Sequence, residues 1–180
     1  MSIIDSNITL LEALREKDIP LEIQTALALL SLDYISFDGE AHTGQLVVHE
    51  RVADDIEKIF TALHEAAFPI GKMIPIAVYE WDDEDSMQDN NTSAFNYRTI
   101  LGKAKLSNHA LGLAIDINPR INPSVSQDGL VQPSGAAYDI LRAGAVAEGG
   151  EVVKLFRSYG WKWGGDWNDP KDWQHFEKPL

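Results

Sequence analysis

A short apolar stretch in the middle of the chain, residues 113–117, carries a single carboxylate in the sequence Leu-Ala-Ile-Asp-Ile. That pattern is typical of a buried β-strand, and burying a carboxylate costs free energy unless it is paired or binds a metal. Asp116 therefore constrains the fold, because the chain must supply a partner for it. On composition alone, backbone N–H groups at the end of the strand would satisfy this carboxylate equally well.

Two histidines are candidates for that partner. His109 lies seven residues before Asp116, with Gly112 between them, and His175 lies three residues after Asp172 near the C-terminus. Two imidazoles and one carboxylate are a plausible set of three zinc ligands, which leaves a fourth position for water. The spare carboxylate, Asp172, could then activate that water. Each histidine alone is more simply a surface, capping or core residue.

Asp172 and His175 cannot both face one metal from a regular strand. Three residues span roughly 10 Å in an extended strand, and odd offsets face opposite sides. We therefore expect a turn or a bulge between the two residues that brings both side chains together. In the alternative interpretation, Asp172 pairs with Lys171 or with a turn N–H group. The other histidines receive no metal role, since one lies on a predicted helix and two flank a predicted strand: His64, His42 and His49.

An acidic segment, residues 81–93, leads directly into the sequence Phe-Asn-Tyr-Arg at residues 95–98. Such a run is usually a solvated loop, and it could also form the rim of a binding cleft. Arg98 is either a surface ion pair with that loop or a cation for negative charge that develops on a substrate oxygen. Ser107 either caps a turn or helps to bind substrate beside His109, and we predict the second role.

The composition argues against several classes of partner and of site. The chain has 28 acidic and 15 basic residues and a formal net charge of −13, which argues against nucleic acid and disfavours adhesion to anionic membranes. The absence of cysteine excludes a disulfide framework, a thiolate ligand and a cysteine nucleophile. No apolar run approaches the ~20 residues that span a bilayer, and the N-terminus lacks the features of a signal peptide. We expect a monomer, and the compartment stays open.

Hydrophobic periodicity predicts a mixture of helices and strands. Helices are expected over residues 7–17, 20–30 and 50–67 and within 146–159. Strands are expected at residues 45–48, 74–79, 113–117 and 173–176, and a surface loop at 124–137. Helices come first and paired strands late, which predicts an α+β fold with a small, mostly antiparallel sheet. We divide the chain into an N-terminal helical segment, residues 1–34, packed on a core of residues 35–180.

Two stretches of the chain resemble the signature motifs of the zinc D-Ala-D-Ala peptidase family, the VanY-like peptidases. The stretch from Ser107 to Asp116 matches all five fixed positions of the first motif, Ser-x-His-x-x-Gly-x-Ala-x-Asp. Asp172 and His175 match the second, (Glu/Asp)-x-x-His. The Phe-Asn-Tyr-Arg element most resembles the branch with L-alanyl-D-glutamate endopeptidases and phage endolysins. Some members have Glu where this chain has Asp172, which bears on the subfamily more than on activity.

The resemblance, which covers roughly residues 35–178, implies a role for each candidate residue. His109, Asp116 and His175 would bind one zinc ion per chain, Asp172 would be the catalytic base, and Arg98 would be the transition-state cation. The implied function is hydrolysis of peptide bonds in peptidoglycan stem peptides, at the cell wall or in the periplasm. A non-catalytic zinc-containing module that binds wall peptides is one alternative. A D,D-dipeptidase or carboxypeptidase, instead of an endopeptidase, is another.

Overall fold

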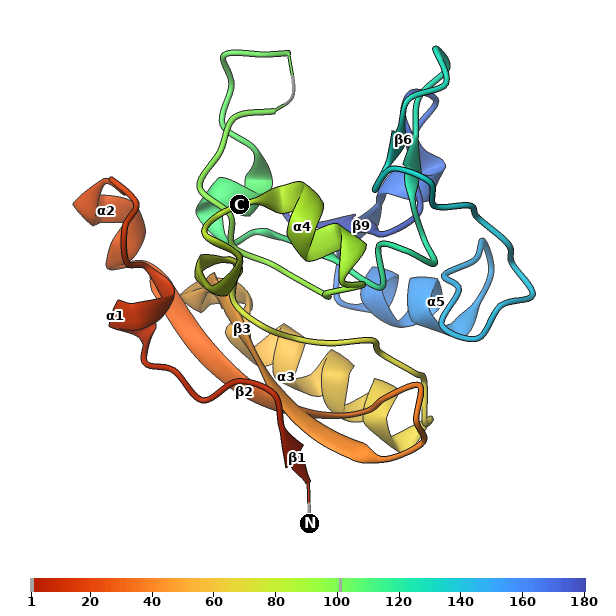
Figure 1. Cartoon of the computed structure of the whole chain (residues 1–180), viewed down its shortest axis with the longest axis horizontal. Helices are drawn as coiled ribbons and strands as arrows, with labels where there is room; N and C mark the ends of the chain where they lie inside the picture. The colour runs from red at the N-terminus through yellow and green to blue at the C-terminus, as the bar shows by residue number, and fades with distance from the viewer. Residues whose placement is uncertain (1, 101) are drawn as a thin grey trace.

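Within the part of the chain that the structure describes, three small β-sheets of three strands each form the framework, and the helices pack around them (Figure 1). The computed structural model describes residues 2–100 and 102–180. Among the named strands of these residues, β1 and β3 form the one parallel pair, and the other pairs are antiparallel. The predicted α+β class with small, mostly antiparallel sheets is confirmed.

The first sheet contains β1 (Ile3–Ile4), β2 (Leu27–Ile35) and β3 (Ala41–His49), with β3 in the middle. A long amphipathic helix, α3 (Glu50–Glu65), follows β3 directly and confirms the helix predicted over residues 50–67. Its apolar side chains repeat at helical spacing and are buried: Val52, Ile56, Ile59, Phe60 and Leu63. The helix therefore covers the sheet and closes the core on that side.

The N-terminal segment is less helical than predicted. Its helices are the short α1 (Leu10–Ala13) and α2 (Leu21–Gln24). The helix predicted over residues 20–30 is wrong from Leu27 onward, where β2 begins. Alternate residues of β2 are buried from Leu30 to Tyr34, so pairing with β3 outweighs the weaker helical pattern. The division of the chain at residue 34 stays a prediction, although the end of that segment pairs with β3.

The second and third sheets are built from very short strands. The second has the order β4 (Ala114–Asp116), β9 (His175–Glu177) and β7 (Lys162–Trp163). The third has the order β6 (Val131–Gln132), β5 (Ser124–Val125) and β8 (Lys171–Asp172). The strand predicted at 113–117 is therefore confirmed. Residues 124–137, predicted as a loop, contain the hairpin of β5 and β6.

Two further segments differ from the sequence prediction. The strand predicted at residues 74–79 is wrong, because Ile76–Tyr79 form a 3₁₀ helix, η1, that begins after Pro75. The acidic segment contains a helix, α4 (Asp83–Gln88), whose first turn is entirely acidic. Carboxylates at a helix N-terminus interact favourably with its dipole, and the Asp82 side chain caps the helix by accepting a hydrogen bond from the backbone N–H of Asp85.

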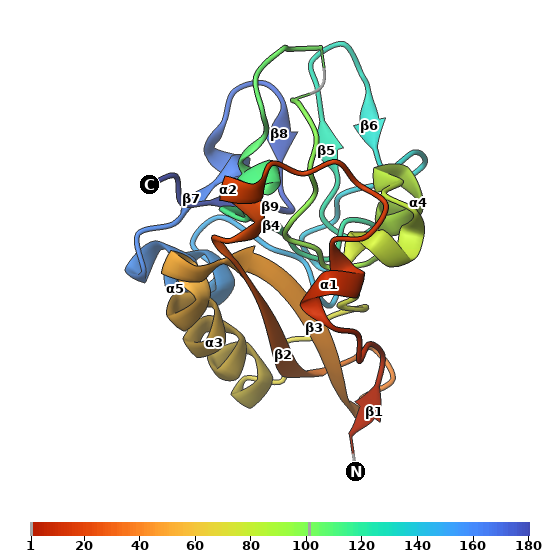
Figure 2. The same cartoon turned by 90° about the vertical axis from the view of Figure 1, so that its left-hand side faces the viewer.

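The hydrophobic core lies between the first sheet, α3, the second sheet and α5 (Glu151–Ser158). Phe156 of α5 stacks on Phe176 of β9 with ring centroids 4.0 Å apart. In Figure 1, α3 and α5 lie below β9 and β6 lies above it, and Figure 2 shows β5, β6 and β8 above the strands of the second sheet. The second sheet is thus packed against the core from one side. Within the described ranges, no helix is long and apolar enough to cross a membrane.

Candidate metal centre

Three buried side chains from three different elements converge on one point. His109 comes from the 3₁₀ helix η2 (Asn108–Leu111), Asp116 from β4 and His175 from β9. One ligand atom from each residue lies within 4.8 Å of the others. Asp116 Oδ1 is 2.9 Å from His175 Nδ1, and Asp116 Oδ2 is 3.1 Å from His109 Nε2. The arrangement offers two ring nitrogens and one carboxylate to a single cation.

The register of β4 and β9 places Asp116 directly opposite His175, so the two side chains share one face of the sheet. Gly112 ends η2 in the left-handed conformation, with φ of +68°. A Cβ atom there would lie 2.5 Å from the backbone N of His49, so only glycine permits this close approach. The turn at Gly112 therefore returns the chain into β4 with His109 beside Asp116.

Ser107 is the N-cap of η2, where its hydroxyl accepts a hydrogen bond from the backbone N–H of His109 at 3.3 Å. A capping role was one of the two alternatives for this residue. Its side chain is buried next to the centre, and a contact with substrate stays a prediction. The cap fixes the start of η2 and thereby the place of the His109 ring.

The ring nitrogens that point away from the centre are also engaged. His109 Nδ1 donates to the backbone carbonyl of Ala94 at 2.5 Å, so the Nε2 lone pair faces the centre. His175 Nε2 is 3.3 Å from Glu177 Oε2. Such partners orient a histidine and fix the nitrogen that can bind a metal.

The electrostatics of the cluster are dominated by burial and by mutual attraction. Burial alone would raise the pKa of Asp116, but the neighbouring imidazoles of His109 and His175 lower that pKa well below its usual range. Burial alone would lower the pKa of His175, but hydrogen bonds to Asp116 and Glu177 raise it to about 10. A cation that binds here would displace these protons, because metal ligands must be deprotonated.

The donor set fits zinc. Imidazole nitrogen and carboxylate oxygen are both common zinc ligands, and the chain has no cysteine that would favour a closed thiolate site. Three protein ligands are typical of a catalytic zinc site, which keeps one coordination position open, whereas structural sites are closed by four. All three donors are buried and already face one another, so little rearrangement would be needed to bind an ion.

Asp172 ends β8, opposite Ser124 of β5. Residues 173–174 form a bend between β8 and β9, where a turn or a bulge was predicted, and the approach of Asp172 to the same metal as His175 stays a prediction. Asp172 Oδ1 is buried and has no hydrogen-bond partner within residues 2–100 and 102–180. Burial, followed by the negative charge of Asp116, raises the pKa of Asp172 to about 6. A Cβ at Gly164 would lie 2.6 Å from the Asp172 carbonyl oxygen, so this glycine also permits a close approach.

The Phe-Asn-Tyr-Arg segment runs alongside the segment that carries His109. The backbone N–H of Asn96 donates to the His109 carbonyl at 3.1 Å, and that of Ser107 donates to the Arg98 carbonyl at 3.1 Å. These two bonds pair the segment of Arg98 with the segment of His109.

The Arg98 side chain forms an ion pair with the acidic segment. Its Nε lies 2.9 Å from Asp83 Oδ2 at the start of α4, and both side chains are about one-third exposed, at 33% and 32%. Asp83 Oδ1 also accepts a hydrogen bond from Asn96 Nδ2 at 3.0 Å. The surface ion pair considered from the sequence is thus present, and the role of Arg98 as a cation for substrate stays a proposal.

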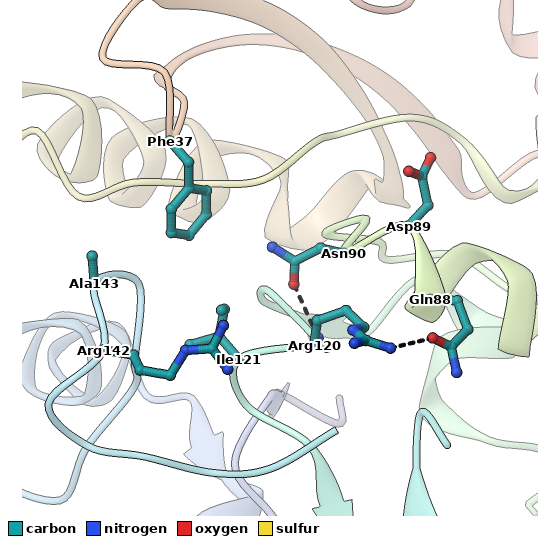
Figure 3. A pocket seen from close by; sticks show the side chains of 8 residues that line it. All are labelled: Phe37, Gln88, Asp89, Asn90, Arg120, Ile121, Arg142 and Ala143. Atoms are coloured by element: carbon teal, nitrogen blue, oxygen red, sulfur yellow. Dashed lines mark hydrogen bonds between the residues drawn. The ribbon is translucent and has the colours of Figure 1, made fainter. Parts of the chain in front are cut away.

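A cavity of about 550 Å³ lies elsewhere, between the β2–β3 turn, the end of α4 and residues 142–143 (Figure 3). Its lining residues are Phe37, Gln88, Asp89, Asn90, Arg120, Ile121, Arg142 and Ala143. Arg120 is held within it by Gln88 and by the Asn90 side chain, which accepts from the Arg120 backbone N–H at 2.9 Å. His109, Asp116 and His175 are not among the residues that line this cavity.

The fold and the centre define an α+β protein with a buried His-Asp-His cluster suited to a metal. Residues 101–178 match a family model described as D-alanyl-D-alanine carboxypeptidase. The matched segment contains the three clustered residues and Asp172, and it begins after Arg98. No curated protein and no solved structure gave a match. The match covers less than half of the chain, and the peptidase activity that it suggests is a proposal for this protein.

Sequence reasoning missed the groups that support the two histidines. The Ala94 carbonyl belongs to the backbone and leaves no signal in the sequence. Glu177 did leave one, because residues two apart on a strand share a face, and His175 and Glu177 are two apart in β9. Asn108, which donates to Glu177 at 2.7 Å, directly precedes His109.

Proposed function

We propose that this protein is a zinc-dependent peptidase that hydrolyses peptide bonds in the stem peptides of bacterial peptidoglycan. The observation that carries the proposal is the convergence of His109, Asp116 and His175 to within 4.8 Å in a segment similar to D-alanyl-D-alanine carboxypeptidases. These three residues would hold one zinc ion per chain. When bound, zinc would lower the pKa of a coordinated water and polarise the scissile carbonyl.

Asp172 would act as the general base and then as the general acid. Its carboxylate takes a proton from the attacking water and delivers that proton to the leaving amine. Two features support this role: Oδ1 has no partner in the described part of the chain, and Asp172 is close enough to Asp116 for the two charges to interact. Asp172 stands outside the three-residue ligand set, so a coordination position stays open for water.

Arg98 would hold the negative charge that develops on the carbonyl oxygen. Asp83 engages Nε of the guanidinium, which leaves the two terminal nitrogens able to donate to substrate. The backbone pairing of residues 96–98 with residues 107–109 supports this role, because it holds the segment of Arg98 next to the centre.

The bond that is cut is the open part of the proposal. The Phe-Asn-Tyr-Arg element favours an endopeptidase of the L-alanyl-D-glutamate type, whereas the description of the matched family favours removal of a terminal D-alanine. A carboxypeptidase must bind a free terminal carboxylate, and an endopeptidase needs a cleft open at both ends.

Mass spectrometry of the products formed from purified peptidoglycan tests the proposal. The zinc-loaded protein should release new peptide termini, a chelator should abolish their release, and added zinc should restore it. Loss of D-alanine alone would identify a carboxypeptidase, and a cut within the stem peptide would identify an endopeptidase. Binding of peptidoglycan without any new terminus would contradict the proposal and favour a non-catalytic binding module.

A further inference from the structure

We infer that Glu177 is a positioning residue of the metal centre, because its carboxylate holds the His175 ring with Nδ1 directed at His109 and Asp116. The inference rests on the proposed function, since it concerns how this chain would hold zinc. It assigns to Glu177 no contact with the metal or with substrate.

The geometry of β9 brings Glu177 to the ring. His175 and Glu177 are two residues apart on one strand, so their side chains share a face. Glu177 Oε2 lies 3.3 Å from His175 Nε2, while Nδ1 of the same ring lies 2.9 Å from Asp116 Oδ1. The ring is therefore held from both nitrogens at once.

Glu177 does not belong to the ligand set itself. The two nitrogens of one imidazole point in different directions, and the nitrogen that faces the centre is Nδ1, which is 3.2 Å from His109 Nε2. Glu177 contacts the other nitrogen, so its carboxylate lies on the side of the His175 ring that faces away from the ligand atoms. Any effect of Glu177 on the metal must pass through His175.

With a metal ion at Nδ1, the contact would keep the His175 proton on Nε2. A carboxylate at Nε2 favours the tautomer with the proton on Nε2, which leaves the Nδ1 lone pair for a metal. Asn108 Nδ2 donates to the same Glu177 oxygen at 2.7 Å. Since Asn108 precedes His109, Glu177 links the two segments that carry the histidines. His109 is oriented instead by the Ala94 carbonyl, which no side-chain substitution removes.

Zinc affinity measured by competition with a fluorescent chelator tests the inference on wild type, Glu177→Ala and Glu177→Gln. The dissociation constant should rise about 10–100-fold in Glu177→Ala, the range usual for loss of such a partner, and less in Glu177→Gln, whose amide oxygen can still accept. Asp55→Asn is the matched control. Asp55 Oδ2 lies 2.7 Å from Nζ of Lys178, the residue that follows Glu177. The Asp55→Asn substitution removes this neighbouring carboxylate and should leave the zinc affinity unchanged.

NMR of the histidine ring nitrogens supplies a readout that a purely structural role would not move. In zinc-loaded wild type, the His175 proton should reside on Nε2, and its resonance should shift or vanish in Glu177→Ala. Wild-type zinc affinity and an unchanged His175 tautomer in both Glu177 variants would overturn the inference and leave the proposed function intact. Wild-type protein that binds no zinc would instead overturn the proposed function. If Glu177→Ala does not fold, the Gln variant decides by the same two measurements.

Discussion

Two clusters of histidine and carboxylate in this molecule differ in the direction of their ligand atoms. In the candidate metal centre, atoms of His109, Asp116 and His175 all face one point. In the first sheet, His42 Nδ1 lies 3.0 Å from Asp5 Oδ2, and His42 Nε2 lies 3.0 Å from Asp38 Oδ2. The two aspartates are at opposite ring nitrogens, so no single ion can bind all three. Residue types alone therefore do not define a metal site.

The His42 cluster has a structural role instead. Asp5 follows β1 and Asp38 lies in the turn between β2 and β3, so His42 ties both to the central strand. Tyr34 adds a hydrogen bond from its hydroxyl to Asp5. Burial lowers the pKa of His42, but its hydrogen bonds to Asp38 and Asp5 outweigh burial and raise the pKa above its usual value. The two carboxylates thus favour the protonated form of the ring more than water does.

The largest expected effect is a loss of hydrolysis, and it should distinguish the role of Asp172 from that of Asp116. Asp172→Asn keeps the size of the side chain but cannot accept a proton, so hydrolysis should fall by roughly 10²-fold or more while zinc stays bound. Asp116→Asn should lose the zinc as well, because it removes a charged ligand. Metal analysis and turnover of the two variants check this. Zinc lost from Asp172→Asn would make Asp172 a ligand, and unchanged turnover would remove it from the mechanism.

Arg98 variants test whether the guanidinium that pairs with Asp83 has a catalytic role. Arg98→Ala should bind zinc normally and lose about 10²–10³ in kcat, the scale of one lost oxyanion donor. Arg98→Lys should recover little, because a point charge replaces a planar fork. The control is Asp83→Asn, which weakens the ion pair but keeps the guanidinium and should retain most of the activity. Wild-type turnover of Arg98→Ala would show that Arg98 is only the surface ion pair with Asp83.

A substitution of His42 tests whether the His42 cluster stabilises the fold without binding the metal. His42→Gln should keep its zinc and its turnover but lose about 1–3 kcal/mol of unfolding free energy, because it breaks hydrogen bonds to two carboxylates. Thermal or urea unfolding of zinc-loaded protein measures this loss. A variant that loses its zinc while still folded would show that the two clusters are coupled.

The pH dependence of that loss is the smallest effect. The pKa of His42 is raised in the folded state, so its contribution to stability is fully present below the unfolded pKa of about 6.5 and disappears as pH rises through the folded pKa. The difference in unfolding free energy between wild type and His42→Gln should therefore be largest near pH 6 and shrink in alkaline buffer. A difference that stays constant over that range would mean that folding does not raise the pKa of His42.

The sequence predicted the residues of the candidate metal centre better than it predicted the short β-strands. Asp116 in an apolar strand signalled a partner, and the spacing of the histidines identified candidates, but the convergence depends on the register of β4 with β9, which pairs residues far apart in the chain. The helix α3 was predictable because sixteen residues repeat one pattern. Strands of two residues leave no periodicity to detect, so the hairpin of β5 and β6 was predicted as a loop.

Local patterns also gave wrong answers where tertiary contacts decide. Residues 27–30 suit a helix and a strand alike, and the pairing of β2 with β3 selects the strand. The apolar run at residues 74–79 has strand composition, yet it contains η1, which ends at Glu80 in the left-handed conformation. The groups behind the histidines, the Ala94 carbonyl and Asn108, became visible only when the backbone placed them.

The zinc content of the purified protein tests the central claim most directly. Wild type and His42→Ala should each carry about one zinc per chain after removal of excess metal, whereas His175→Ala should carry none while it remains folded. That result would locate the metal at the point where His109, Asp116 and His175 converge. Wild-type protein without zinc, or a full equivalent of zinc retained by folded His175→Ala, would contradict the account.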